Sequence, residues 1–240
     1  MLLVGGTGEA RDLAQELVRA GVRVVSSLAG AVSRPRLPAG EVRIGGFGGV
    51  DGLRSWLLEH RPVAVVDASH PFAARISRSC VAACAAVGVP LLRLERPAWT
   101  AEPGDRWTEV DDVPASALAA AELGRRLLVT TGRRELAPFA ALAGVSVLAR
   151  CVDPPDEPLP PHIEVLLDRG PYTVPGELSL LRDNAIDVLV TKNSGGALVA
   201  AKLAAAREVD LPVVVVRRPV PAGAATVPDV PAARAWLARL

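Results

Sequence analysis

Short aliphatic runs that alternate with helical segments constrain the fold of this chain more than any other feature. Such runs, almost wholly apolar, are typical of parallel strands covered by helices on both faces. The sequence therefore predicts an α/β fold with mostly parallel open sheets. The expected strands are 1–6, 22–28, 41–47, 63–68, 91–95, 126–131, 145–151, 163–167, 187–191 and 213–217. The expected helices are 11–20, 53–60, 73–87, 115–123, 135–143, 175–184, 197–208 and 231–239.

The two halves of the chain resemble each other. Three segments match in the same order: 2–7 with 127–132, 65–68 with 189–192, and 90–97 with 212–219. Their order and near-constant offset predict two similar Rossmann-like lobes with a cleft between them, and not one continuous sheet. Proline, glycine and aspartate interrupt the pattern between Pro97 and Arg126. We therefore place the boundary near residue 100, with lobes at 1–100 and 101–240.

Composition narrows the classes of function. Half of the 240 residues are apolar and 22% are charged, as in a globular protein with an ample core. A net charge of +1 provides no basic field for nucleic acid, and no apolar run reaches the roughly 18 residues of a membrane span. A strand at the initiator leaves no room for a signal peptide, and three cysteines form no disulfide framework or metal site. We expect a cytoplasmic protein, a monomer or weak homo-oligomer, with a small-molecule partner.

Glycines and hydroxyl groups follow the first two predicted strands. Ligands of open α/β sheets bind beyond the carboxyl ends of the strands. The turn Gly5–Glu9 departs from G-x-G-x-x-G, yet it combines glycines with a helix start that attracts phosphate. Ser27–Gly30 lacks the acid that would hold the ribose of NAD, and Arg34 and Arg36 follow, which favours NADPH. Alternatively, the glycines serve only the turn and the arginines lie in an exposed loop.

Cationic residues follow the later strands. Thr191–Gly196 ends an apolar run with a lysine, two hydrogen-bonding side chains and two glycines. This pattern indicates an anion site, or else an ordinary turn with a solvated lysine. Arginines gather at other strand ends, and guanidinium groups bind carboxylates in bidentate fashion. Together they predict a crevice for a polyanionic substrate. These arginines are Arg93, Arg96, Arg133, Arg169, Arg217 and Arg218.

Aromatic residues make up only 3% of the chain, so those beside strand ends are informative. Phe47 lies between two glycine pairs and either contacts a flat ligand or fills the core. His70 precedes Pro71-Phe72 and either donates a proton or hydrogen bond, or packs at a helix start.

An ordered set of motifs extends over nearly the whole chain. They are GGTGEAR (5–11), SLAG (27–30), RIGGFGG (43–49), DASHPFA (67–73), RLERPAW (93–99), TTGRREL (130–136), RGPY (169–172), TKNSGG (191–196) and PVVVVRRP (212–219). In this combination the chain resembles the precorrin-6A reductase family of cobalamin biosynthesis, including its cobalt-precorrin-6A members. The resemblance implies a two-lobed enzyme that uses NADPH to reduce one double bond of a macrocycle with many carboxylates, giving the 6B form. Two departures are Ala31, where the family often has arginine, and Ala197-Leu198, where a threonine is expected nearby.

The expected site residues follow from the motifs and the resemblance. Lys192 and one proton donor among His70, Asp67 and Tyr172 are the catalytic candidates. The predicted cofactor contacts are Gly6, Thr7, Glu9, Ser27, Leu28, Ala29, Gly30, Arg34, Gly46, Phe47, Gly48 and Gly49. The predicted substrate contacts are Arg133, Arg169, Lys192, Asn193, Ser194, Gly195 and Arg218. The alternatives are another NADPH-dependent reductase of a polyanion, and a two-lobed sensor that binds NADPH without turnover.

Overall fold

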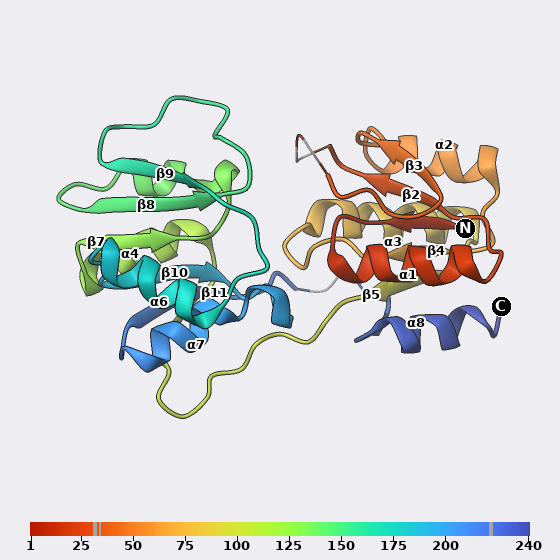
Figure 1. Cartoon of the computed structure of the whole chain (residues 1–240). Helices are drawn as coiled ribbons and strands as arrows, with labels where there is room; N and C mark the ends of the chain where they lie inside the picture. Colours follow the sequence, from red (N-terminus) through yellow and green to blue (C-terminus); the bar gives the residue numbers. More distant parts are fainter. Residues whose placement is uncertain (31–32, 34, 221–222) are drawn as a thin grey trace. The chain divides into compact units, whose positions relative to one another are not determined.

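The chain forms two compact units, each built on its own parallel sheet (Figure 1). The computed structural model describes residues 1–30, 33, 35–220 and 223–240. Unit 1 consists of Met1–Pro97 and Pro219–Leu240, and unit 2 of Ala98–Arg218. Each sheet has six strands, and helices cover both of its faces. The predicted α/β class with two Rossmann-like lobes is confirmed.

The sheet of unit 1 has the strand order β12-β5-β4-β1-β2-β3. Its strands are β1 (Leu2–Val4), β2 (Val25–Leu28), β3 (Glu41–Ile44), β4 (Val65–Asp67), β5 (Leu91–Leu94) and β12 (Ala225–Val227). Its helices are α1 (Gly8–Arg19), α2 (Val50–His60), α3 (Ala74–Val87) and α8 (Val230–Leu237). From β1 the chain continues to β2 and β3 on one side of β1, and it then crosses to β4 on the other side. The neighbouring ends of β1 and β4 are therefore the switch point at which such sheets bind ligands.

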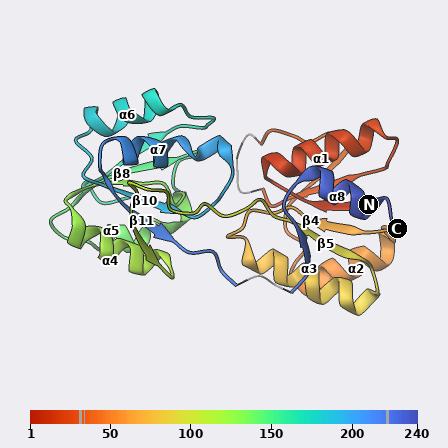
Figure 2. The same ribbon diagram turned by 90° about the horizontal axis from the view of Figure 1, so that it is seen from below.

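Side chains along the central strands point alternately to the two faces of the sheet, and this produces the two cores of unit 1. Leu3 and its neighbours on β4 and β5 face α1 and α8, which lie side by side in Figures 1 and 2. Leu2 and Val4 face α2 and α3 on the other side of the sheet. Successive side chains of a strand point to opposite faces, so a run of three aliphatic residues supplies both layers.

The sheet of unit 2 repeats this plan in the order β6-β11-β10-β7-β8-β9. Its strands are β6 (Arg106–Val110), β7 (Arg126–Val129), β8 (Ser146–Cys151), β9 (Ile163–Leu167), β10 (Val188–Lys192) and β11 (Pro212–Val216). Its α-helices are α4 (Val113–Leu123), α5 (Ala137–Ala140), α6 (Val174–Asp183) and α7 (Ala201–Glu208), with short 3₁₀ turns η1 (Arg133–Glu135) and η2 (Ala197–Val199). The switch point here lies between β7 and β10.

The two units have exchanged their last strand and helix. β6 follows β5 along the chain but pairs with β11, whereas β12 follows β11 but pairs with β5. The exchanged helices begin alike, with Asp112-Val113-Pro114-Ala115 before α4 and Asp229-Val230-Pro231-Ala232 before α8. In both, the aspartate carboxylate accepts a hydrogen bond of 2.8 Å from the alanine N–H and caps the helix. The repeat therefore extends to the exchanged segments.

This exchange changes the predicted lobe boundaries. The first division falls at Pro97–Ala98, close to the predicted residue 100, but residues 219–240 belong to unit 1 and not to a lobe of residues 101–240. Neither β6 nor β12 was among the predicted strands. Both are edge strands with a single partner and mostly exposed or half-buried side chains, so neither leaves a continuous apolar run.

The three cysteines, Cys80, Cys84 and Cys151, are free and buried. Burial raises the pKa of Cys84 to about 11, so this thiol stays protonated at neutral pH. Among the described residues no group of histidine, cysteine and acidic side chains has the arrangement of a metal site. No helix in the described ranges has the length and apolarity needed to cross a membrane.

A charge placed on α8 should destabilise unit 1, because Ala233 is fully buried against the core of that unit. We expect Ala233→Asp to cost several kcal/mol and to increase hydrogen exchange in β5 and α1. Ala235→Asp, on the exposed side of the same helix, is the control and should change little. Increased exchange confined to β11 and β6 would contradict the exchanged topology.

Candidate functional site

The turn after β1 leaves its backbone open while its flanks are fixed. Thr7 accepts a hydrogen bond of 3.1 Å from Ala10 N at the start of α1 and donates one of 2.9 Å to Ala68 O after β4. Gly6 has a φ of +128°, and apart from its chain neighbours no heavy atom of the described residues lies within 4 Å of the position that a Cβ would occupy. The turn is thus tied to β4 at the switch point, with room for a ligand to approach the backbone at Gly6.

The predicted contact Glu9 lies in the first turn of α1 and pairs with Arg96 at 2.9 Å. This ion pair offsets the negative charge that Glu9 would otherwise present beside the helix start. Anion binding at the N-terminus of α1 is therefore opposed less than the sequence alone indicates.

Arg43, which was not predicted, organises the loop after β3. Its guanidinium donates to Ser27 Oγ at 3.2 Å, Gly45 O at 2.7 Å and Gly46 O at 2.8 Å. It also lies 3.9 Å from the ring centre of Phe47. The predicted residues Ser27, Gly46 and Phe47 therefore form one cluster. Phe47 also contacts Trp56 edge to face, so its ring is partly packed and only partly open to a ligand.

Other predicted cofactor contacts around this cluster differ in exposure. Leu28 is buried, whereas Ala29, Gly30, Gly48 and Gly49 are exposed. Arg34 lies outside the described residues.

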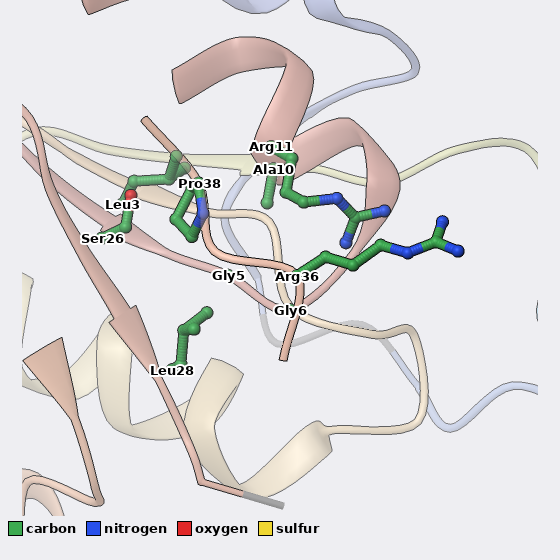
Figure 3. A pocket seen from close by; sticks show the side chains of 9 residues that line it. All are labelled: Leu3, Gly5, Gly6, Ala10, Arg11, Ser26, Leu28, Arg36 and Pro38. Carbon is green, nitrogen blue, oxygen red and sulfur yellow. The ribbon is translucent and has the colours of Figure 1, made fainter. Parts of the chain in front are cut away.

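A small cavity separates the glycine turn from β2 (Figure 3). Its volume is about 10 Å³, which is about the smallest cavity that can hold one water molecule. Ser26 Oγ lines the cavity, is buried, and has no hydrogen-bond partner among the described residues. Because buried polar groups are almost always satisfied, a partner beyond the described residues, such as a water molecule or a ligand atom, is expected for this hydroxyl. The lining residues are Leu3, Gly5, Gly6, Ala10, Arg11, Ser26, Leu28, Arg36 and Pro38.

The candidate acid Asp67 is the centre of a buried ion-pair network. Its side chain accepts hydrogen bonds from Ser69 N at 3.0 Å and from the Arg93 guanidinium at 2.6 Å. Arg93 also donates to Ser77 Oγ at 2.6 Å and pairs with Glu95. Only 3% of the Asp67 side chain and 5% of the Arg93 side chain are exposed. These contacts fit Asp67 as the anchor of the loop that carries His70.

His70 follows Asp67 in this anchored loop. Phe72 N donates to His70 Nδ1 at 3.2 Å, so Nδ1 is an acceptor. In the neutral imidazole the proton is then on Nε2, which becomes the donor. The structure therefore favours the Nε2-protonated tautomer of His70, in which Nε2 can donate a hydrogen bond.

In unit 2, the loop 193–196 is fixed to two distant segments. Asn193 accepts from Trp99 N at 2.8 Å and donates to Trp99 O at 2.9 Å, and Trp99 Nε1 donates to Gly196 O at 3.0 Å. Arg218 donates to Asn193 O at 2.9 Å and to Ser194 O at 3.1 Å. The Asn193 amide thus holds the backbone of Trp99, and the predicted residues Asn193, Ser194 and Arg218 are brought together.

The remaining candidates of unit 2 lie around this loop or near β8. Lys192 pairs with Glu135 at 2.8 Å, and the Glu135 side chain is 37% exposed. Arg133 donates to Pro154 O at 3.0 Å and pairs with Asp156. Gly195 is buried, whereas Arg169 is exposed.

Tyr172 is held by contacts with Asp168 and Arg150. Its hydroxyl donates to Asp168 O at 3.3 Å, and the Arg150 guanidinium lies 3.9 Å from its ring centre. Burial raises the pKa of Tyr172, so the phenol stays protonated at neutral pH.

A buried charged cluster lies beneath Trp99 and Tyr172. Arg150 and Glu177 form an ion pair of 2.7 Å with side chains 4% and 1% exposed, and one Glu177 oxygen has no partner among the described residues. Lys202 is also buried, and its ammonium nitrogen lies 5.2 Å from the ring centre of Trp99. Burial and the nearby Arg150 lower the pKa of Lys202 from 10.5 to about 7. The cluster was not predicted, because Arg150, Glu177 and Lys202 lie in three different apolar segments.

Removing Arg93 should test the anchoring role of the Asp67 network. Arg93→Met leaves the buried Asp67 carboxylate without its partner, and we expect a loss of about 3–5 kcal/mol in unfolding free energy. The control is Arg234→Met, because the exposed pair of Arg234 with Glu16 should contribute less than about 1 kcal/mol. Chemical denaturation measures both variants. An equal loss of unfolding free energy in the two variants would show that Arg93 does not stabilise the buried Asp67 carboxylate.

Lys202→Met should stabilise unit 2 in a pH-dependent way. Between pH 7 and 10.5 the unfolded chain carries a proton on Lys202 that the folded chain lacks, so the unfolding free energy rises with pH across this window. The variant loses this dependence, and we expect a gain of about 1–4 kcal/mol below pH 7 that shrinks toward pH 10.5. Denaturation across this range is the measurement, with exposed Arg182→Met as control. A pH-independent difference would contradict the expectation.

The chain is similar to known proteins over its whole length. The family model described as precorrin-6x reductase CbiJ/CobK matches residues 1–238. A precorrin-6A reductase of Rhodococcus erythropolis is 49% identical over 242 residues, covering 100% of this chain and 98% of the relative. One of Mycobacterium tuberculosis (strain H37Rv) is 48% identical with the same coverage. A cobalt-precorrin-6A reductase of Priestia megaterium is 31% identical and covers 91% of this chain and 90% of its own length.

A solved structure described as CobK precorrin-6A reductase is similar to the whole chain. It has a TM-score of 0.94 and 43% sequence identity, and the match covers 99% of this chain and 95% of that one. The fold, the full-length sequence match and the family model agree. The chain therefore belongs to the precorrin-6x reductase family.

Proposed function

We propose that this protein reduces one double bond of precorrin-6A with NADPH, giving the 6B form in cobalamin biosynthesis. The full-length similarity to precorrin-6A reductases, in sequence and in structure, carries the proposal. Relatives named for precorrin-6A are 44–49% identical to this chain, and those named for cobalt-precorrin-6A are 29–31% identical. This difference favours the metal-free macrocycle as substrate.

Unit 1 fits a nicotinamide dinucleotide. The open backbone at Gly6, the start of α1 and the unpartnered Ser26 hydroxyl together suit a pyrophosphate and its ribose. The exposed residues Ala29 and Gly30 follow β2 where an NAD enzyme would carry an acid, which supports NADPH. NADPH would supply the hydride, and the protein residues would orient the cofactor and its partner.

Unit 2 offers cations to a macrocycle that bears many carboxylates. Lys192 lies at the end of β10, and its partner Glu135 is partly exposed, so a substrate carboxylate can replace Glu135 at the ammonium. Thr131 Oγ1 follows β7 at the same edge of the sheet and has no partner among the described residues. Arg133, Arg169 and Arg218 extend the cationic character of these loops. We assign the substrate carboxylates to this group.

Reduction adds a hydride to one carbon of the double bond and a proton to its neighbour. His70 and Tyr172 are the proposed donors of the proton, directly or through water, because each presents a protonated nitrogen or oxygen. Asp67 is the less suitable donor, since its carboxylate is held by Arg93 in a buried ion pair. Its proposed role is to position the loop of His70.

The proposal is tested by incubating purified protein with NADPH and metal-free precorrin-6A. We expect the absorbance band of the reduced nicotinamide to decay only when the macrocycle is present, and the product mass to match addition of a hydride and a proton. Cobalt-loaded precorrin-6A is the comparison and should give a lower kcat/KM. The Lys192→Met variant should raise KM or lower kcat. Absence of NADPH oxidation with either macrocycle would refute the proposed reaction.

A further inference from the structure

Two arginine side chains extend past the glycine turn of unit 1 without a hydrogen bond or ion pair to the described residues. Arg11 comes from α1 and Arg36 from the segment after β2, and both line the small cavity beside Gly6. In Figure 3 their side chains extend in the same direction, away from the Leu3 and Ser26 end of the cavity. Elements separated in sequence thus place two guanidinium groups on the same side of the turn.

Neither guanidinium forms a hydrogen bond or an ion pair with any residue in the described part of the chain. Nearby arginines of unit 1 are instead committed to other groups. Arg43 holds the loop after β3, Arg93 holds Asp67, and Arg96 holds Glu9. The segment 27–40 contains no acidic residue. Within the described part of the chain, the two guanidinium groups at the cavity therefore have no acidic partner, whereas the arginines around them are held by other protein groups.

The position of this pair corresponds to one particular part of a dinucleotide. In βαβ units of this kind the pyrophosphate lies at the helix start after the first strand, and the adenosine ribose lies beyond the end of the second strand. An acid there binds the 2′-hydroxyl of NAD, whereas an arginine accommodates the 2′-phosphate of NADP. The buried and unpartnered Ser26 hydroxyl, on β2 and in the same cavity, is an independent sign that an external polar group completes the site.

We propose that Arg11 and Arg36 together bind the 2′-phosphate of NADPH and determine the preference for NADPH over NADH, an inference that rests on the proposed function. The 2′-phosphate carries between one and two negative charges at neutral pH, and guanidinium groups bind phosphate oxygens in bidentate fashion. Arg36 occupies the segment where dinucleotide enzymes place their ribose contact. Arg11 adds a second cation from α1, the helix whose N-terminus would face the pyrophosphate, so two guanidinium groups share the 2′-phosphate.

The test is a titration of NADPH and NADH into the wild-type protein, Arg11→Met, Arg36→Met and the double variant. Each single substitution should weaken NADPH binding by about tenfold to a hundredfold and leave the Kd of NADH unchanged. Adenosine 2′,5′-bisphosphate and adenosine 5′-monophosphate, used as competing probes, should show the same selective loss. The control is Arg19→Met, because Arg19 is exposed in the last turn of the same helix. Thermal unfolding should be unchanged, since neither guanidinium bonds to the described chain.

The outcomes separate this inference from the reaction itself. Equal losses for NADPH and NADH would place the arginines on the shared pyrophosphate and overturn the inference. Unchanged NADPH affinity in the double variant would also overturn it, while NADPH-dependent reduction of precorrin-6A would stand. A wild-type protein that binds neither nucleotide would refute the proposed function, and this inference with it.

Discussion

Parallel pairing of two exchanged edge strands is the constraint on which both units depend. β12 completes the sheet of unit 1 against β5, and β6 completes that of unit 2 against β11. The helices that follow them, α8 and α4, then cover core residues of the unit that they have joined. The chain must therefore pass between the units twice, at Pro97–Ala98 and at Arg218–Pro219. Every loop of the candidate site belongs to a sheet whose last edge strand comes from the exchanged segment.

The candidate site combines fixed side chains with open backbone. Thr7, Arg43 and the Asp67–Arg93 pair use their hydrogen bonds within the protein, and by doing so they hold the loops after β1, β3 and β4. The groups that we propose to face ligands are mostly the backbone at glycines and a few side chains without a partner among the described residues. Such an arrangement is ordered before a ligand arrives, which lowers the entropic cost of binding.

Central strands and strand-end motifs were predictable from the sequence, because aliphatic runs and glycine-rich turns are local signals. The same local signals indicated Gly6, Lys192 and the absence of an acid after β2. Pairing between distant residues was not predictable. Asn193 binds the backbone of Trp99 and Arg93 binds Asp67, yet nothing in the sequence distinguishes these partners from other polar residues. The edge strands β6 and β12 escaped prediction for a related reason: a strand with one partner needs few buried side chains.

The exchange of strands also sets an order in which the sheets can be completed as the chain is synthesised. Unit 2 has all six of its strands once residue 216 has been made. The first five strands of unit 1 are made earlier, but the open edge of β5 stays unpaired until β12 emerges near the end of the chain. An unpaired edge of this kind is a template for association with other chains. The half of the protein that is synthesised first is thus the last to be finished, and its exposed β5 edge is where misassembly during synthesis would begin.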